Sequence, residues 1–270
     1  MSKISFTNKV VVITGGSEGI GKALVDLFLQ KGARVATCGR NFDKLYQLQT
    51  FHAGKPLLTH TADISKQSEC ESFIQKVIKA YGAIDVLINN AGISMRALFK
   101  DTNVATLQKL MDVNFWGTVY CTKLALPYLI QSKGIIVGVS SVAGFVGLPG
   151  RSGYSASKAA MNGWLATIRT ELKDTGVSVI TVCPGFTASN IRKVALNKHA
   201  QPEDESKLDE GRLMSAEVCA QHIYNAAQKK KRMLILTSEG RQAVFFSRFF
   251  PSLTDALVHK FYFKKGQFVK

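Results

Sequence analysis

The sequence predicts an α/β fold in which a doubly wound, parallel, seven-stranded sheet carries helices on both faces, with a C-terminal helical extension. Short apolar runs alternate with amphipathic stretches along the chain, which is typical of a parallel sheet. A glycine-rich turn over residues 14–21 directly follows the first apolar run. With 270 residues, 46% of them hydrophobic, the chain is long enough to bury one large core.

The apolar runs give the strands, and the amphipathic stretches give the helices that connect them. The strands are predicted at residues 9–14, 34–39, 57–61, 86–89, 135–139, 177–182 and 233–236. The helices are predicted at residues 19–31, 41–51, 65–81, 106–132 and 153–175. Pro127 is expected to kink or interrupt the fourth helix. Right-handed crossovers between such strands wind the sheet in both directions.

A tyrosine and a lysine in the last of these helices point to proton transfer. Tyr154 and Lys158 lie four residues apart, and Ser141 lies thirteen residues before the tyrosine. Residues four apart share one helix face, so the ammonium can sit beside the phenol. A free tyrosine has a pKa of about 10, and a nearby cation lowers that pKa by favouring the phenolate. Such a pair is common by chance, but after a glycine-rich turn and with a serine at this distance it predicts an oxidoreductase.

The glycine-rich turn predicts a dinucleotide site. Gly15, Gly19 and Gly21 permit a tight turn and let a diphosphate reach the N-terminus of the next helix, where free N–H groups favour anions. A surface turn without a ligand is the alternative interpretation.

The end of the second strand predicts which dinucleotide is bound. A carboxylate at this place binds the ribose 2′-hydroxyl in NAD enzymes, whereas an arginine accommodates the 2′-phosphate of NADP. Gly39 occupies the acidic position and Arg40 follows it, and a planar guanidinium suits phosphate. Glu18 weighs against this choice, because its carboxylate does not help a phosphate to bind. We therefore expect NADP(H).

Together these motifs resemble the short-chain dehydrogenase/reductase family, in its single-domain branch with a Rossmann-type fold. The likeness runs from Lys9 to about Leu236 and includes the sequence NNAG at residues 89–92. Ser189 stands where a threonine is usual in the family. Within the family, residues 134–169 and the C-terminal extension are most similar to eleven-beta-hydroxysteroid dehydrogenases and 3-ketosphinganine reductases. The residues that fill the four catalytic positions are Asn114, Ser141, Tyr154 and Lys158.

The resemblance implies a role for each of these residues. Ser141 would hydrogen-bond a substrate carbonyl, Tyr154 would deliver the proton, and Lys158 would lower the pKa of the tyrosine and hold the nicotinamide ribose. Asn114 would support a water that relays protons, and Asp63 would bond the adenine amino group. The expected cofactor-binding residues are Thr14, Gly15, Gly16, Ser17, Glu18, Gly19, Ile20, Gly21, Arg40, Asp63, Ile64, Asn90, Ala91, Gly92, Tyr154, Lys158, Pro184, Gly185, Thr187 and Ser189.

The implied function is that of an NADP(H)-dependent oxidoreductase that interconverts a carbonyl and a secondary alcohol on a hydrophobic substrate, sterol-like, sphingoid or long acyl. A 3-oxoacyl thioester reductase of fatty acid synthesis is the alternative enzyme, although such chains usually end soon after the seventh strand. A non-enzymatic NADP-sensing protein is the third candidate, but these commonly lose the tyrosine or the lysine. The residues expected to line the substrate pocket are Met95, Phe145, Val146, Leu148 and Phe186.

Residues 1–240 are interpreted as one catalytic domain, since no linker, repeat or low-complexity tract divides them. Residues 197–212 are strongly polar and break the alternation of strands and helices. They form either a solvated surface loop or part of a mobile lid over the substrate, at about residues 187–212.

Composition limits the partners and the location of the protein. The formal net charge is +16, but no helix-turn-helix or RNA-binding signature accompanies it, so no nucleic-acid partner is expected. Five scattered cysteines indicate reduced, buried thiols, and five histidines without metal-ligand spacing argue against a metal site. The first residues are polar and no apolar stretch approaches the roughly 20 residues of a membrane span, so a cytoplasmic location is expected. The long helices at 106–132 and 153–175 are the usual family dimer interface, so a homodimer is expected, with a tetramer as the alternative.

Residues 241–270 form an amphipathic, basic extension. From Phe246 onward, apolar residues recur largely at three- and four-residue intervals, and Pro251 should divide the segment into two short helices. Aromatic residues on one face and cations on the other describe an interfacial helix, which would place this segment on the inner face of the membrane. The alternative is that these aromatic residues pack on the protein's own core or on a partner subunit.

Overall fold

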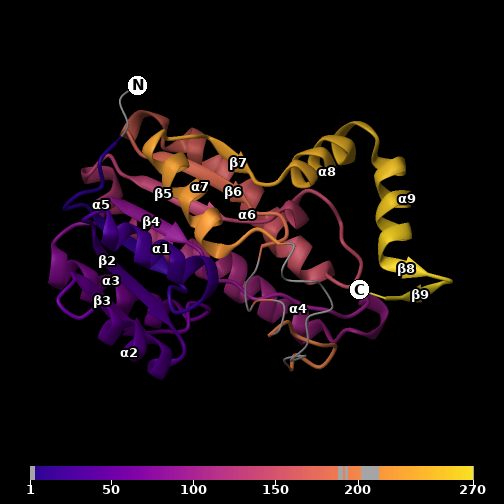
Figure 1. Ribbon diagram of the computed structural model, residues 1–270, viewed down its shortest axis with the longest axis horizontal. Helices are drawn as coiled ribbons and strands as arrows, with labels where there is room; N and C mark the ends of the chain where they lie inside the picture. Colours follow the sequence, from indigo (N-terminus) through magenta and orange to yellow (C-terminus); the bar gives the residue numbers. More distant parts are fainter. Residues whose placement is uncertain (1–3, 188–190, 192–193, 202–212, 270) are drawn as a thin grey trace.

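A seven-stranded parallel sheet forms the centre of the molecule (Figure 1). The computed structural model describes residues 4–187, 191, 194–201 and 213–269. The strand order β3-β2-β1-β4-β5-β6-β7 reverses direction between β1 and β4, as in a doubly wound fold. The strands are β1 (Val10–Thr14), β2 (Arg34–Gly39), β3 (Leu57–Thr61), β4 (Val86–Asn89), β5 (Ile135–Val139), β6 (Ser178–Cys183) and β7 (Met233–Ile235). The predicted fold class is confirmed.

Helices cover both faces of this sheet because each strand is apolar on both sides. Helices α1 and α7 pack on one face around Phe28, whereas α3, α5 and α6 pack on the other around Phe73 and Leu165. The helices of the main body are α1 (Gly19–Gln30), α2 (Phe42–Phe51), α3 (Gln67–Tyr81), α4 (Val104–Met111), α5 (Gly117–Gln131), α6 (Ser152–Glu171) and α7 (Ala216–Gln228).

The long helix expected at residues 106–132 is irregular at Asp112–Trp116 and is not interrupted at Pro127. The chain continues helically through Pro127, whose ring lies on the exposed side of α5. The break lies instead at Asp112–Trp116, a π-helical turn between α4 and α5. Such turns contain one extra residue and are frequent at functional sites. Helix α7 is a further difference, because no helix was predicted between the sixth and seventh strands.

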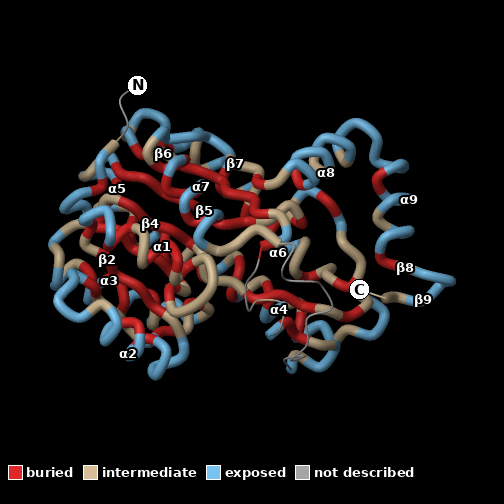
Figure 2. Tube along the Cα trace, viewed as in Figure 1, coloured by how far each residue is buried: buried red, intermediate tan, exposed pale blue. Residues whose placement is uncertain are grey.

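The C-terminal segment forms an arm of two helices, α8 (Ser238–Phe249) and α9 (Pro251–Tyr262), with Pro251 at the predicted division. An antiparallel hairpin, β8 (Phe263–Lys264) and β9 (Gln267–Phe268), follows it and was not predicted. In Figure 1 the arm leaves the main body and the chain end returns toward α6. Most of the arm is exposed in Figure 2. Among the residues described here, no helix has both the length and the apolar character needed to cross a membrane.

All five cysteines are free and buried, as expected. Burial raises the pKa of Cys38, Cys183 and Cys219 to about 12 in each case. The thiolate, which is the reactive form, is therefore strongly disfavoured at neutral pH. These thiols pack as small apolar groups in the core.

Candidate active site

One continuous cavity of about 1110 Å³ opens at the carboxyl ends of the central strands. Its volume exceeds the roughly 300–1,000 Å³ that is usual for a single small-molecule pocket. The glycine-rich turn and Arg40 line one end of the cavity, and the start of α6 and helix α9 line the other. The cavity therefore has room for two ligands placed end to end.

The turn between β1 and α1 is shaped to leave space for a ligand. Gly15 and Gly19 have φ angles of +70° and +53°, in the left-handed region that favours glycine. A Cβ on Gly15 would lie 2.9 Å from the Cα of Ala91, and one on Gly21 would collide with the carbonyl of Gly15. Helix α1 begins at Gly19 without a side-chain cap, so the N–H groups of its first turn have no side-chain acceptor. This cradle fits the diphosphate of a dinucleotide.

Residues after β4 hold this cradle in place. The Oγ1 of Thr14 accepts hydrogen bonds from the backbone N–H groups of Asn90 and Ala91, both at 3.0 Å. The Nδ2 of Asn90 in turn donates to the carbonyls of Thr14 at 3.0 Å and Gly15 at 3.2 Å. Thr14 and Gly16 lie beneath the cavity wall, whereas Asn90, Ala91 and Gly92 line it. The amide of Asn90 thus fixes the turn that surrounds the ligand site.

The end of the cavity beside the glycine-rich turn carries a cation, Arg40, at the place where dinucleotide-binding folds distinguish NAD from NADP. Arg40 is exposed at the cavity edge directly after β2. The Nζ of Lys44 lies 2.6 Å from the Oε1 of Glu18, so the carboxylate that weighed against NADP is paired. Lys44, which the sequence did not single out, also lines the cavity. Asp63 lines it as well, with its Oδ1 accepting from the backbone N–H and the hydroxyl of Ser65 at 3.0 and 2.8 Å.

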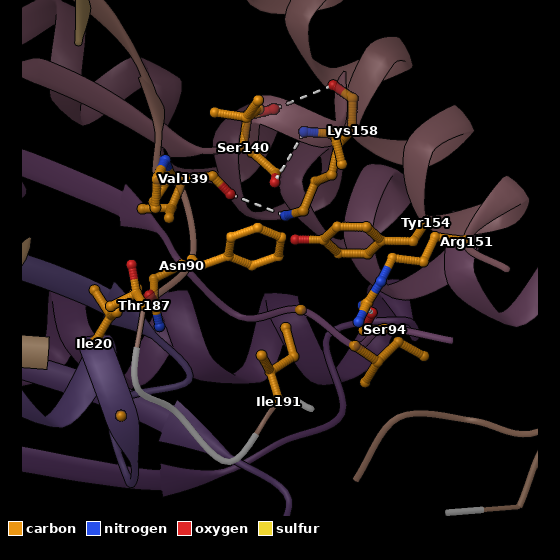
Figure 3. A pocket seen from close by; sticks show the side chains of 18 of the residues that line it. Ile20, Asn90, Ser94, Val139, Ser140, Arg151, Tyr154, Lys158, Thr187 and Ile191 are labelled. Carbon is orange, nitrogen blue, oxygen red and sulfur yellow. Dashed lines mark hydrogen bonds between the residues drawn. The ribbon is translucent and has the colours of Figure 1, made fainter. Parts of the chain in front are cut away.

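Tyr154 and Lys158 meet in the middle of the cavity, on one face of α6 (Figure 3). The side chain of Lys158 is buried, with the residue only 3% exposed, and its Nζ donates to the carbonyl of Val139 at 2.9 Å. The same Nζ lies 5.9 Å from the centroid of the Tyr154 ring. Burial lowers the pKa of Lys158 to about 8. The ammonium lies beside the phenol ring, as the spacing of four residues on one helix predicts.

Ser141 and Asn114 occupy different positions relative to this pair. Ser141 lines the cavity, and its Oγ accepts from the N–H of Ala143 at 3.1 Å. Asn114 is fully buried behind the cavity wall. Its Oδ1 accepts from the N–H of Ile93 at 2.8 Å, and its Nδ2 donates to the carbonyl of Ile93 and the Oγ of Ser157, both at 2.9 Å. Asn114 therefore joins the loop after β4 to helix α6.

Most of the residues predicted to bind cofactor or substrate line this one cavity. Met95 and Phe145 do not: Met95 is buried in the core, where its Sδ accepts from the N–H of Gly153 at 3.3 Å, and Phe145 lies at the surface. Ser189 and most of the predicted lid lie outside the described residues. The predicted residues that line the cavity are Gly15, Ser17, Glu18, Gly19, Ile20, Gly21, Arg40, Asp63, Ile64, Asn90, Ala91, Gly92, Ser141, Val146, Leu148, Tyr154, Lys158, Pro184, Gly185, Phe186 and Thr187.

The C-terminal arm supplies a wall of the cavity that the sequence did not predict. Residues of α8 and α9 close the end that lies beyond Tyr154. Most are apolar or aromatic, which makes this end suitable for a hydrophobic ligand. They include Ala243, Phe246, Thr254, Leu257, Val258, Phe261 and Tyr262.

The fold and this site define a dinucleotide-dependent oxidoreductase. Residues 9–200 match the model of the family described as short chain dehydrogenase, and the chain belongs to this family. Its members act on alcohols and carbonyls. The predicted family is therefore confirmed.

Several proteins of known name are similar to this chain. It is 34% identical over 243 residues to dehydrogenase/reductase SDR family member 7B of Mus musculus, covering 87% of this chain and 75% of that protein. It is 34% identical over 262 residues to 11-beta-hydroxysteroid dehydrogenase A of Arachis hypogaea, covering 92% and 73%. A crystal structure of a short chain dehydrogenase/reductase from Burkholderia phymatum in complex with NAD has the same fold, with a TM-score of 0.84 at 19% identity over 93% and 96% of the two chains.

The burial of Lys158 predicts a pH dependence of stability. Its folded pKa of about 8 lies below the ordinary value of 10.5, so between these pH values the unfolded chain binds more protons than the folded one. The free energy of unfolding of the cofactor-free protein should then gain about 2 kcal/mol from this residue between pH 8 and pH 10. Urea unfolding should show that gain in the wild type and not in Lys158→Met. The exposed Lys79→Met is the matched control, and an equal pH dependence in all three proteins would contradict the prediction.

Proposed function

We propose that the protein is an NADP(H)-dependent oxidoreductase that interconverts a carbonyl and a secondary alcohol on a hydrophobic substrate, sterol-like, sphingoid or long acyl. The observation that carries this proposal is the pairing of a buried Lys158 ammonium with the Tyr154 ring at the centre of a cavity with apolar walls. Perturbed titratable groups in a cleft mark functional sites.

The side chains around the reacting carbonyl would divide the chemistry between them. The nicotinamide, when bound, supplies or accepts the hydride. Tyr154 gives its hydroxyl proton to the carbonyl oxygen during reduction and takes it back during oxidation, while the positive charge of Lys158 stabilises the phenolate left behind. The Oγ of Ser141 accepts from the N–H of Ala143, which leaves its own hydrogen available to donate to the substrate oxygen. Asn114 holds the loop beside this site in place. We also propose that it supports a water molecule that relays protons.

Replacing the tyrosine tests this mechanism. Tyr154→Phe keeps the ring and removes the proton, so kcat for NADPH-dependent reduction should fall by about 10²–10⁴-fold. NADPH consumption is to be followed with a panel of steroid, sphingoid and long-chain acyl ketones, alongside small polar ketones. Tyr46→Phe, at an exposed tyrosine outside the cavity, is the matched control. Wild-type rates in Tyr154→Phe on every active substrate would show that the assigned mechanism is wrong.

The choice of NADP(H) is supported by the charges at the end of β2. Arg40 is exposed to a ligand, and the pairing of Glu18 with Lys44 removes an unfavourable carboxylate. Arg40→Ala should weaken NADPH binding by about tenfold, the value of a charge-assisted hydrogen bond, and leave NADH binding unchanged. Titration of both cofactors by fluorescence measures this. Wild-type binding of NADH as tight as that of NADPH would overturn the preference.

We also propose that the C-terminal arm contacts an anionic membrane surface. Phe245 and Phe249 of α8 are 54% and 59% exposed, and Leu257 of α9 is 55% exposed. Cations accompany them at Arg248, Lys260, Lys264 and Lys265. Leu257 also lines the cavity, so the exposed apolar surface continues into the substrate end. A water-insoluble substrate could enter the cavity along this surface.

Vesicle flotation tests the membrane contact. The wild type should float with vesicles that contain phosphatidylserine, and the double variant Phe245→Ser/Phe249→Ser should float much less, because two apolar rings no longer leave water. Phe42→Ser, at an aromatic residue of α2 that is 64% exposed, is the matched control. A wild type that stays in the soluble fraction, or a control that loses as much binding as the double variant, would contradict the proposal.

A further inference from the structure

A second cation, at the residue directly before α6, lines the same cavity as Tyr154. Arg151 occupies the N-cap position of α6, three residues before Tyr154, whereas Lys158 lies one helical turn after the tyrosine. Figure 3 shows the guanidinium of Arg151 beside the tyrosine, directed at Ser94. The Nη1 of Arg151 donates to the Oγ of Ser94 at 2.6 Å. Arg151, Ser94 and Tyr154 all line the cavity.

A second neighbour of Arg151 comes from the C-terminal arm. Tyr262, at the end of α9, lies close enough to Arg151 for the positive charge to act on the pKa of its phenol. Tyr262 is buried, and its ring stacks on Phe268 of the terminal hairpin. Burial raises the pKa of Tyr262, with Arg151 opposing the rise, so this phenol is neutral at physiological pH. The guanidinium therefore donates to one uncharged hydroxyl, that of Ser94, and lies near a second, that of Tyr262.

The acidic groups of the cavity are engaged elsewhere. Glu18 pairs with Lys44, and the carboxylate of Asp63 accepts from the backbone N–H of Ser65, at the end beside the glycine-rich turn. Glu239 is exposed at the start of α8. Among the described residues, no carboxylate forms an ion pair with Arg151. A partly buried cation that faces an apolar cavity with only neutral partners is unfavourable unless a ligand supplies the negative charge.

We propose that Arg151, together with the hydroxyls of Ser94 and Tyr262, binds a carboxylate or phosphate group of the substrate. The substrate is then an anionic amphiphile, with an apolar chain against the C-terminal arm and the anion close to the reacting carbonyl. The guanidinium lies beside the Tyr154 ring in Figure 3, so only a few bonds separate the anion from the carbonyl that Tyr154 would protonate. The fork of a guanidinium binds two oxygens of such a group at once. This inference rests on the proposed function for the role of Tyr154.

Ligands that cannot react test the anion site without turnover. The full-length protein, saturated with NADP⁺, is titrated calorimetrically with laurate, dodecyl phosphate, 1-dodecanol and inorganic phosphate. At least one of the two anionic amphiphiles should bind about tenfold or more tightly than the alcohol, as charge-assisted hydrogen bonds require. Inorganic phosphate alone should bind weakly, because it lacks the apolar chain.

Variants of Arg151 separate recognition from general attraction and from a structural role. Arg151→Gln should reduce the affinity for laurate and dodecyl phosphate to that for dodecanol, and leave dodecanol binding unchanged. Arg151→Lys, which keeps the charge and loses the fork, should give an intermediate affinity. Lys109→Gln removes the same charge from an exposed position at the cavity edge, and should retain the preference for the anions.

Four results would overturn the inference, three of them measured with the amphiphiles. The first is that the wild type binds dodecanol as tightly as the anionic amphiphiles. The second is that Arg151→Gln still prefers the anionic amphiphiles. The third is that dodecanol binding falls by the same factor as anion binding in Arg151→Gln, because Arg151 would then hold the arm in place rather than bind the anion. Inorganic phosphate that binds as tightly as dodecyl phosphate would also overturn it, since the site would then take a free anion. A protein that prefers the anionic amphiphiles but reduces no carbonyl would refute the proposed function and leave the anion site standing.

Discussion

The burial of one ammonium group constrains much of this molecule. Lys158 must leave water to lie behind Tyr154, and an unpaired buried cation is costly. Among the described residues, its Nζ donates a hydrogen bond to the carbonyl of Val139, at the end of β5. A Cβ on Gly92 would lie 3.4 Å from that Nζ and 3.0 Å from the Oδ1 of Asn114, so a larger residue there would crowd both groups. The environment of this one charge therefore constrains how strand β5, the loop after β4 and helix α6 are placed relative to one another.

The π-helical turn at Asp112–Trp116 meets a related requirement. Asn114 lies inside this turn and bonds both backbone groups of Ile93 as well as the Oγ of Ser157. A buried amide must have its donors and acceptors satisfied, and here the loop after β4 and helix α6 together satisfy one side chain. The apolar pattern of residues 106–132 indicates a helix but carries no sign of an extra residue in one turn. The expected interruption at Pro127 was wrong, because the helical backbone continues through that residue from Gly117 to Gln131.

The sequence predicts the sheet well because parallel strands buried on both faces are continuous apolar runs. The runs at β2, β3, β4 and β5 have the predicted bounds. Helix α7 was missed although its signal is present, since Cys219, Ala220, Ile223 and Ala227 recur on one helix face and are buried. The strongly polar residues 197–212 directly precede this region and favoured the prediction of a loop. Met95 was misplaced for a different reason: adjacency to the NNAG turn does not say whether a side chain faces the core or the cavity.

The two ends of the cavity differ in how far the sequence reveals them. The cofactor end is built from turns that directly follow strands, so residues close in sequence are also close in space, and short motifs describe them. The substrate end is completed by α9, whose Tyr262 comes near Arg151, the residue before α6, only through the tertiary fold. No local pattern around Arg151 predicts that proximity. The proposed catalytic side chains are therefore encoded locally, whereas the proposed substrate end depends on where the C-terminal arm lies relative to the start of α6.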